Sequence, residues 1–169
     1  MSEIIHKNDR IRLRKINEED LDFIMTEQEK LENKQYIPNW SRSKHLEAME
    51  DTDFIYLMVE AYPDFRPVGY TILSGIESDC KSIDFRQVVI TEKGKGFGRE
   101  TLRLTKQLAF EKFRAHRIRM EIWAHNANSL AMCRSEGLFQ EGIVRDCVRE
   151  DYRYLSYVIM SMLESEYYT

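Results

Sequence analysis

The chain has 169 residues, of which 43% are hydrophobic and 32% charged, and its formal net charge is −4. This length and apolar share are typical of one globular domain and exclude a disordered or fibrous protein. The negative net charge argues against a general nucleic-acid binder, and no apolar run approaches the roughly 20 residues of a transmembrane helix. We therefore expect a single domain over residues 1–169, with neither nucleic acid nor membrane as its partner.

The cysteines and histidines predict neither disulfides nor a metal site. The chain has three cysteines, Cys80, Cys133 and Cys147, an odd number without C-x-x-C spacing, and its four histidines show no ligand-like pairing. Such a pattern fits a reducing compartment. The N-terminal segment lacks the apolar core and cleavage site of a signal peptide, so we expect a cytoplasmic protein.

The N-terminal part predicts one strand followed by two helices. Alternating hydrophobic and polar residues indicate a strand over 10–16. Asn17 is a suitable N-cap for a helix over 18–30, whose first turn is acidic. A second helix is expected to begin after Ser41 or Ser43.

The middle of the chain predicts three strands. Residues 54–60 and 68–73 are rich in β-forming side chains and are separated by a turn over 63–67, which indicates a hairpin. Another strand is expected over 83–91.

The C-terminal half predicts an alternation of helices and strands. A helix starts near Gly98, and strict alternation indicates a strand over 117–124. Two last strands fit 138–144 and 153–163. Strands that precede and alternate with helices predict a mixed α/β sheet.

A glycine-rich segment between a strand and a helix carries the clearest chemical signal. The strand residues are followed by three glycines and three basic residues; the candidate ligand-binding set is Val88, Val89, Ile90, Lys93, Gly94, Lys95, Gly96, Phe97, Gly98 and Arg99. Glycines let the backbone approach a ligand closely, and the free amides and dipole of a helix N-terminus attract phosphate oxygens. The alternative interpretation is a glycine-rich turn with solvated lysines.

Two common nucleotide-binding motifs do not match this segment. The P-loop requires G-x-x-x-x-G-K-[ST], which is absent from the sequence. The dinucleotide fingerprint requires G-x-G-x-x-G after a first strand, whereas this chain has G-x-G-x-G in its middle. A nucleotide-phosphate binder therefore remains a weaker hypothesis.

The segment EKGKGFGRETLRLTKQLAF resembles motif A of the GNAT acetyltransferase superfamily, Arg/Gln-x-x-Gly-x-Gly/Ala, with Lys93 first, Gly96 fourth and Gly98 sixth. Downstream, HNANSLAMCRSEGLFQEG resembles motif B, in which Asn126 or Asn128 can cap a helix that stops at Gly137. The tail, RDCVREDYRYLSYVIMSMLESEY, is similar to the closing strands of the subgroup with ribosomal-protein and spermidine acetyltransferases. The similarity extends from about Arg10 nearly to the C-terminus.

This resemblance implies an α/β (α+β) fold, with a mixed six- or seven-stranded sheet splayed at its centre and about four flanking helices. It also implies acetyl-CoA as cosubstrate, no metal and a possible homodimer. By this resemblance, the pantetheine arm would be held by Val88, Val89 and Ile90. The pyrophosphate would be held by residues 93–99, and Asn126 would bind the pantetheine region.

The implied activity is N-acetylation of a primary amine by direct attack: a protein N-terminus, a polyamine or a small-molecule amine. A base must take a proton from the cationic amine, and an acid must protonate the leaving thiolate. Asp84 occupies the approximate place of the family's carboxylate, although a solvent-facing Asp is an equal interpretation. Glu92, Glu121 and water are weaker alternatives as the base.

The acid position departs from the family pattern, because Cys133 stands where relatives commonly have Tyr. A thiol has an ordinary pKa of about 8.5 and could donate a proton, but a small buried side chain without a chemical role is the favoured alternative. The substitution motivates a second hypothesis, a CoA-binding regulatory relative with weak or no catalysis.

The resemblance implies that two segments build the acceptor side: the one that connects the first two helices, and the closing hairpin. Those segments contribute aromatic and charged residues, namely Tyr36, Ile37, Trp40, Asp146, Arg149, Tyr152 and Tyr154. Aromatic and acidic groups suit an amine, and they equally suit a packed core.

Overall fold

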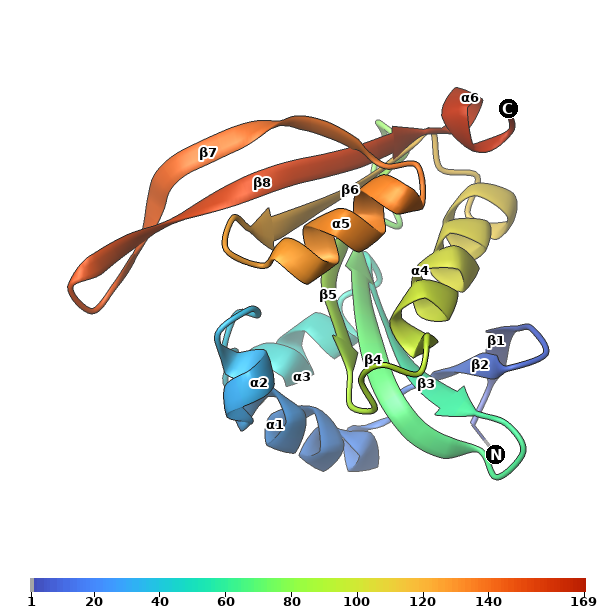
Figure 1. The fold of residues 1–169 in the computed structure, drawn as a ribbon. Helices are drawn as coiled ribbons and strands as arrows, with labels where there is room; N and C mark the ends of the chain where they lie inside the picture. Colours follow the sequence, from blue (N-terminus) through green and yellow to red (C-terminus); the bar gives the residue numbers. More distant parts are fainter. Residues whose placement is uncertain (1) are drawn as a thin grey trace.

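The structure, a computed structural model, describes residues 2–169. Eight strands form one sheet in the order β1-β2-β3-β4-β5-β6-β8-β7 (Figure 1). The strands are β1 (Ile4–Lys7), β2 (Ile11–Lys15), β3 (Phe54–Ala61), β4 (Arg66–Ser74), β5 (Ser82–Ile90), β6 (Arg117–Trp123), β7 (Phe139–Glu150) and β8 (Arg153–Leu163). The helices are α1 (Leu21–Glu29), α2 (Leu31–Lys34), α3 (Arg42–Glu50), α4 (Phe97–Gln107), α5 (Ala127–Ser135) and α6 (Glu164–Tyr167).

The sheet has eight strands, not the predicted six or seven. The extra strand, β1, is an edge strand that pairs antiparallel with β2. Its four residues, IIHK, are too few to show a period, which is why the sequence did not reveal it. Two helices, α2 and α6, are also single turns of four residues that no periodicity predicts. The mixed α/β class itself is confirmed.

The predicted helix over 18–30 is divided into two parts. A 3₁₀ turn, η1 (Glu18–Asp20), precedes α1. Asn17 forms a capping box, in which its side chain accepts from the amide of Asp20 and the Asp20 carboxylate accepts from the amide of Asn17. Asp20 also accepts two hydrogen bonds from Arg14 of β2, at 2.7 and 3.0 Å. This pairing fixes the entry of α1 against the sheet.

Helices cover both faces of the sheet. On one face, Leu21 and Ile24 of α1 and Ala48 of α3 share a core cluster with Tyr70 of β4. On the other face, Leu102 of α4 and residues of α5 pack in a second cluster with side chains of β2 to β6 and of β8. A π-helical turn, η2 (Leu108–Lys112), continues α4. The sheet is therefore the middle layer of three.

The sheet opens at its centre, as the resemblance implied. Strands β5 and β6 are parallel, but they pair only over residues 82–84 of β5 and 117–119 of β6. Beyond Asp84, β5 continues to pair with β4, and β6 continues to pair with β8. Each strand therefore leaves one edge without a strand partner, and the gap between these edges positions the site.

The C-terminal hairpin is longer than predicted. Strand β7 continues to Glu150 instead of stopping near Val144, and the pairing register with β8 shifts between Val144 and Val148. The irregularity interrupts the alternation that would have revealed the longer strand. Figure 1 shows β7 and β8 extending together beyond the rest of the sheet. Within residues 2–169, no helix has the length and apolarity needed to cross a bilayer.

Candidate active site

A pocket of about 650 Å³ lies where β5 and β6 diverge. Its walls come from the second half of β5, the glycine-rich turn before α4, the free edge of β6, the start of α5 and the segment after α2. Nearly all the site residues expected from the sequence line it: Asp84, Val88, Val89, Ile90, Lys93, Gly94, Gly96, Phe97, Gly98, Arg99, Asn126 and Cys133. Lys95 does not line the pocket.

The glycine-rich turn presents backbone donors at the N-terminus of α4. Gly94 and Gly96 adopt φ angles of 77° and 83°, in the left-handed region that favours glycine. Gly96 is the N-cap of α4 and supplies no side-chain cap. Within residues 2–169, the amides of Gly96, Phe97 and Gly98 donate to no protein acceptor. Free amides at the positive end of a helix dipole suit phosphate oxygens, so the turn fits the pyrophosphate of CoA.

The basic side chains of this turn are already engaged with the protein. Lys93 Nζ donates to Asn33 Oδ1 at 3.0 Å, and Lys95 Nζ donates to Glu92 Oε2 at 2.7 Å. Hydrogen bonds from Arg66 and Lys95 lower the pKa of Glu92 to about 2. The side chain of Lys95 is thus held outside the pocket, while that of Lys93 lies along the pocket wall.

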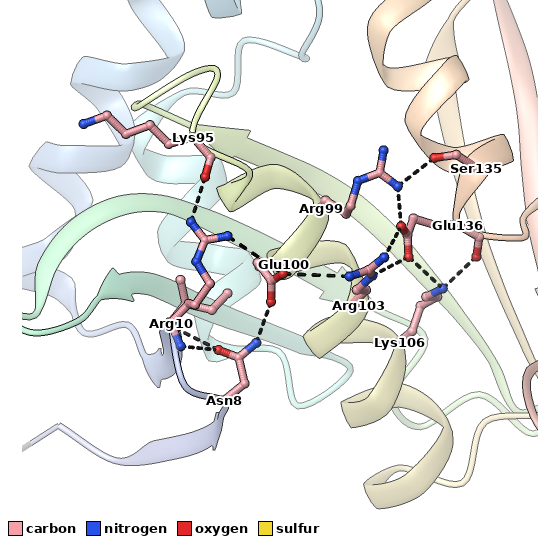
Figure 2. A network of polar contacts seen from close by, with 10 residues as sticks. Asn8, Arg10, Lys95, Arg99, Glu100, Arg103, Lys106, Ser135 and Glu136 are labelled. Carbon is pink, nitrogen blue, oxygen red and sulfur yellow. Dashed lines mark hydrogen bonds and ion pairs between the residues drawn. The ribbon is translucent and has the colours of Figure 1, made fainter.

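Arg99 belongs to a polar network that joins the start of α4 to the end of α5 (Figure 2). It donates to Ser135 Oγ at 2.8 Å and pairs with Glu136, which also pairs with Arg103 at 2.8 Å. On the other side, Arg10 donates to the carbonyl oxygen of Lys95 at 2.8 Å. These contacts fix the glycine-rich turn from both sides.

Asp84 lies at the point where β5 and β6 separate. Its carboxylate is 3.1 Å from a guanidinium nitrogen of Arg119 and 3.6 Å from one of Arg86. Arg119 also donates to Glu121 at 2.6 Å. Asp84 therefore reaches the pocket as a member of an ion-pair cluster and not as a lone carboxylate.

Cys133 lies on α5 with its side chain on the pocket wall and only 1% of its surface exposed. Its Sγ donates to the Met120 sulfur at 3.5 Å. Burial raises the pKa of the thiol to about 12. A group with this pKa stays protonated at neutral pH and gives up its proton less readily than an ordinary thiol.

The Asn126 cap is confirmed, since its side chain accepts from the amide of Ser129 at 3.3 Å and α5 follows directly. Asn126 is also one of the residues that line the pocket.

The acceptor side combines expected and unexpected residues. Tyr36, Ile37 and Trp40 line the pocket as expected. The four expected hairpin residues, Asp146, Arg149, Tyr152 and Tyr154, do not line it. They belong to the distal part of the β7–β8 hairpin and its turn, outside the stretch of β8 (157–163) that pairs with β6.

Sequence reasoning missed two aromatic residues of the pocket, Trp123 and Tyr157. Their rings stack with centroids 4.0 Å apart, one from β6 and one from β8. The alternation over 117–124 placed Trp123 on the same face as Arg119 and Glu121. No signal in the sequence indicated that Tyr157 lies beside it.

Comparisons with solved structures give the same architecture. A spermidine N-acetyltransferase from Vibrio cholerae in complex with CoA and spermine is 22% identical, with a TM-score of 0.85, over 96% of this chain and 100% of that chain. A chimera of SpeG from V. cholerae and hSSAT is 22% identical, with a TM-score of 0.84, over 94% and 98%. A dodecameric form of the V. cholerae enzyme is 22% identical, with a TM-score of 0.80, over 95% and 97%. No curated protein sequence matches the chain significantly.

A sheet that splits at its centre, with a glycine-rich turn at the open edge, is the arrangement expected of an N-acetyltransferase domain. Residues 10–138, more than half of the chain, match the family model described as acetyltransferase (GNAT) domain. The chain therefore belongs to the GNAT acetyltransferase family. The expected enzyme class, an acetyl-CoA-dependent acetyltransferase, is confirmed with it.

Proposed function

We propose that this protein transfers the acetyl group of acetyl-CoA to a primary amine of a polyamine, a small molecule or a protein N-terminus. The observation that carries the proposal is the opening between β5 and β6, which joins the free amides at the N-terminus of α4 to a pocket lined by aromatic and charged side chains. A solved relative in complex with CoA and spermine supports both ligand types. When bound, acetyl-CoA supplies the thioester carbonyl that the amine attacks.

Different residues of the pocket would hold different parts of acetyl-CoA. The amides of residues 96–98 would hold the pyrophosphate, and the unpaired edge of β5 at 88–90 would hold the pantetheine arm through its backbone. Asn126, which lines the pocket, would bind the pantetheine region.

We propose Asp84 as the group that receives the proton of the substrate ammonium. It lies at the vertex of the opening and lines the pocket. Its ion pairs with Arg119 and Arg86 hold the carboxylate in one place, and they also compete with a substrate for its lone pairs. Transfer through one water molecule is compatible with this arrangement.

We propose that Cys133 contributes packing and that the leaving thiolate takes the proton that the attacking nitrogen loses as the amide forms, relayed through water. Proton transfer from a thiol with a pKa of about 12 to an ordinary thiolate is uphill by about 5 kcal/mol. The raised pKa of the Cys133 thiol also supports the second candidate function, a CoA-binding relative with weak catalysis.

The first experiment is thermal unfolding with acetyl-CoA, and with ATP and NAD as controls. A ligand at a hundredfold excess over its Kd stabilises the folded state by about 2.7 kcal/mol. We expect a shift with acetyl-CoA alone, followed by amine-dependent release of free thiol. Stabilisation by acetyl-CoA without thiol release for any amine would favour the second candidate, and no stabilisation at millimolar acetyl-CoA would overturn both.

A further inference from the structure

The segment that forms one wall of the acceptor end of the pocket is held at two points by residues far away in sequence. We call this segment, residues 31–40, the strap; it comprises α2 and the connection to α3, and it contributes Tyr36, Ile37 and Trp40 to the pocket wall. Figure 1 shows the connection between α2 and α3 rising toward the turn between β6 and α5.

His125, in the turn between β6 and α5, makes the first attachment. Its Nε2 donates to the carbonyl oxygen of Gln35 at 3.0 Å, and its ring stacks on Tyr36 with centroids 5.5 Å apart. The same ring lies 6.3 Å from that of Trp123, which in turn stacks on Tyr157. One row of aromatic rings thus runs from the strap to β8 across the acceptor end.

Lys93 makes the second attachment from the glycine-rich turn. Its Nζ donates to Oδ1 of Asn33, a buried side chain whose amide nitrogen donates to the carbonyl oxygen of Glu27 at 2.9 Å. The strap is therefore tied to the cofactor end of the pocket by Lys93 and to the β6 side by His125.

We propose that His125 is a specificity-determining residue, because it pins the strap across the acceptor end of the pocket and so admits slender amines while excluding polypeptide N-termini. The pocket of about 650 Å³ is within the usual size for one small ligand, and the pantetheine arm must share it with the acceptor. An N-terminus on a folded or extended polypeptide needs a wider approach, which the attached strap closes. This inference deepens the proposed function and rests on it.

The attachment itself is tested without any substrate, through tryptophan fluorescence. The chain has two tryptophans, so Trp123→Phe leaves Trp40 of the strap as the single probe. In this background we expect His125→Ala to raise the acrylamide Stern–Volmer constant at least about twofold, because a released strap opens more often. The matched control is His116→Ala, an exposed histidine whose side chain makes no hydrogen bond within residues 2–169. Equal constants in the two variants would overturn the attachment.

The specificity is tested with spermidine and a tetrapeptide with a free N-terminus as acceptors. We expect His125→Ala, with both tryptophans present, to lower the ratio of kcat/KM for spermidine to that for the peptide about tenfold, chiefly through KM. His125→Gln, which keeps a donor and loses the ring, should lie between. A ratio that His125→Ala leaves unchanged would overturn the specificity role. Failure of acetyl-CoA to stabilise the protein would instead overturn the proposed function, and the quenching result would still decide whether His125 holds the strap.

Discussion

The Cys133 thiol donates to the thioether of Met120 at 3.5 Å, across the interface between α5 and β6. This contact directs the thiol at a weak acceptor in an apolar environment, and burial raises its pKa to about 12. Cys133, at the expected acid position, is therefore a packed core residue whose thiol is a weak proton donor.

Replacement of Cys133 by alanine tests whether its proton matters. We expect Cys133→Ala to change kcat less than about threefold and to lower the free energy of unfolding by about 1 kcal/mol, the cost of one lost buried atom. Steady-state kinetics by thiol release and urea unfolding measure the two effects. A loss of kcat of a hundredfold or more, without a matching loss of stability, would identify Cys133 as the acid.

Asp84 is expected to matter for turnover and not for cofactor binding. Asp84→Asn keeps the shape of the side chain and removes its capacity to take up a proton, so kcat should fall about a hundredfold or more while the Kd for acetyl-CoA stays unchanged. Asp79→Asn, at an exposed position, is the control. If Asp84→Asn retained full kcat, a water molecule or another carboxylate would be the acceptor.

Gly96 is required for the shape of the phosphate-binding turn. In Gly96→Ala, the left-handed φ of 83° costs about 1–2 kcal/mol for a residue with a Cβ, which would also lie 3.1 Å from Arg10 Nη1. We expect weaker acetyl-CoA binding and a lower melting temperature. Gly142→Ala, whose Cβ would meet nothing within 4 Å, should change neither. Calorimetric titration with acetyl-CoA measures the two Kd values. Equal Kd values in the two variants would contradict the role of the Gly96 turn in phosphate binding.

Glu136 is the centre of the network between α4 and α5 (Figure 2). Although burial opposes its ionisation, hydrogen bonds from Arg103 and Arg99 keep its pKa below the usual value. The folded carboxyl thus binds a proton more weakly than the unfolded one. Its stabilisation is complete above the unfolded pKa of about 4.3 and is lost as the pH falls through the folded pKa.

Glu136→Gln should therefore lower the free energy of unfolding by about 2 kcal/mol at pH 7 and by less at pH 3.5. Glu141→Gln removes a more exposed pair with Arg117 and should cost less than about 1 kcal/mol. Urea denaturation at the two pH values measures both. If the two variants lost equal free energy of unfolding at pH 7, the Glu136 network would contribute no more stability than a surface ion pair.

Features that depend on neighbouring residues were predictable from the sequence. The caps at Asn17, Ser41 and Asn126 each bond to an amide two or three residues away. The Asn17 cap is confirmed, and of the two pairs of alternatives, Ser41 or Ser43 and Asn126 or Asn128, the first member of each is the cap. The glycine-rich turn was placed for the same reason, because its conformation is local and follows directly after β5.

Features that depend on distant residues were not predictable. The stacking of Trp123 on Tyr157 and the bond from Lys93 to Asn33 join positions 34 and 60 residues apart. Nothing in the pattern of one segment specifies its partner in another. The sequence also did not show how far β7 would extend, and so did not show that the expected hairpin residues would lie outside the pocket wall.

Buried His45 should make stability fall in mild acid. Its Nε2 lies 3.1 Å from Gln28 Oε1, and Gln28 donates to the carbonyl oxygen of Trp40 at 2.6 Å. The Gln28 oxygen therefore accepts from Nε2–H, and Nδ1 accepts from the hydroxyl of Tyr56 at 3.0 Å. The ring is neutral with both nitrogens in use, and burial, with a smaller effect of Lys44, lowers its pKa to about 4.

Since the unfolded histidine binds its proton near pH 6.5 and the folded one near pH 4, the unfolded state gains protons first as the pH falls. The contribution of His45 to the free energy of unfolding is complete above about pH 6.5, and about 3 kcal/mol of it is lost by pH 4. His45→Gln should be less stable than the parent at pH 7 and should lose less stability between pH 7 and 4.5. His116→Ala should follow the parent at every pH, and a parallel decline of His45→Gln and parent would show that the acid sensitivity arises elsewhere.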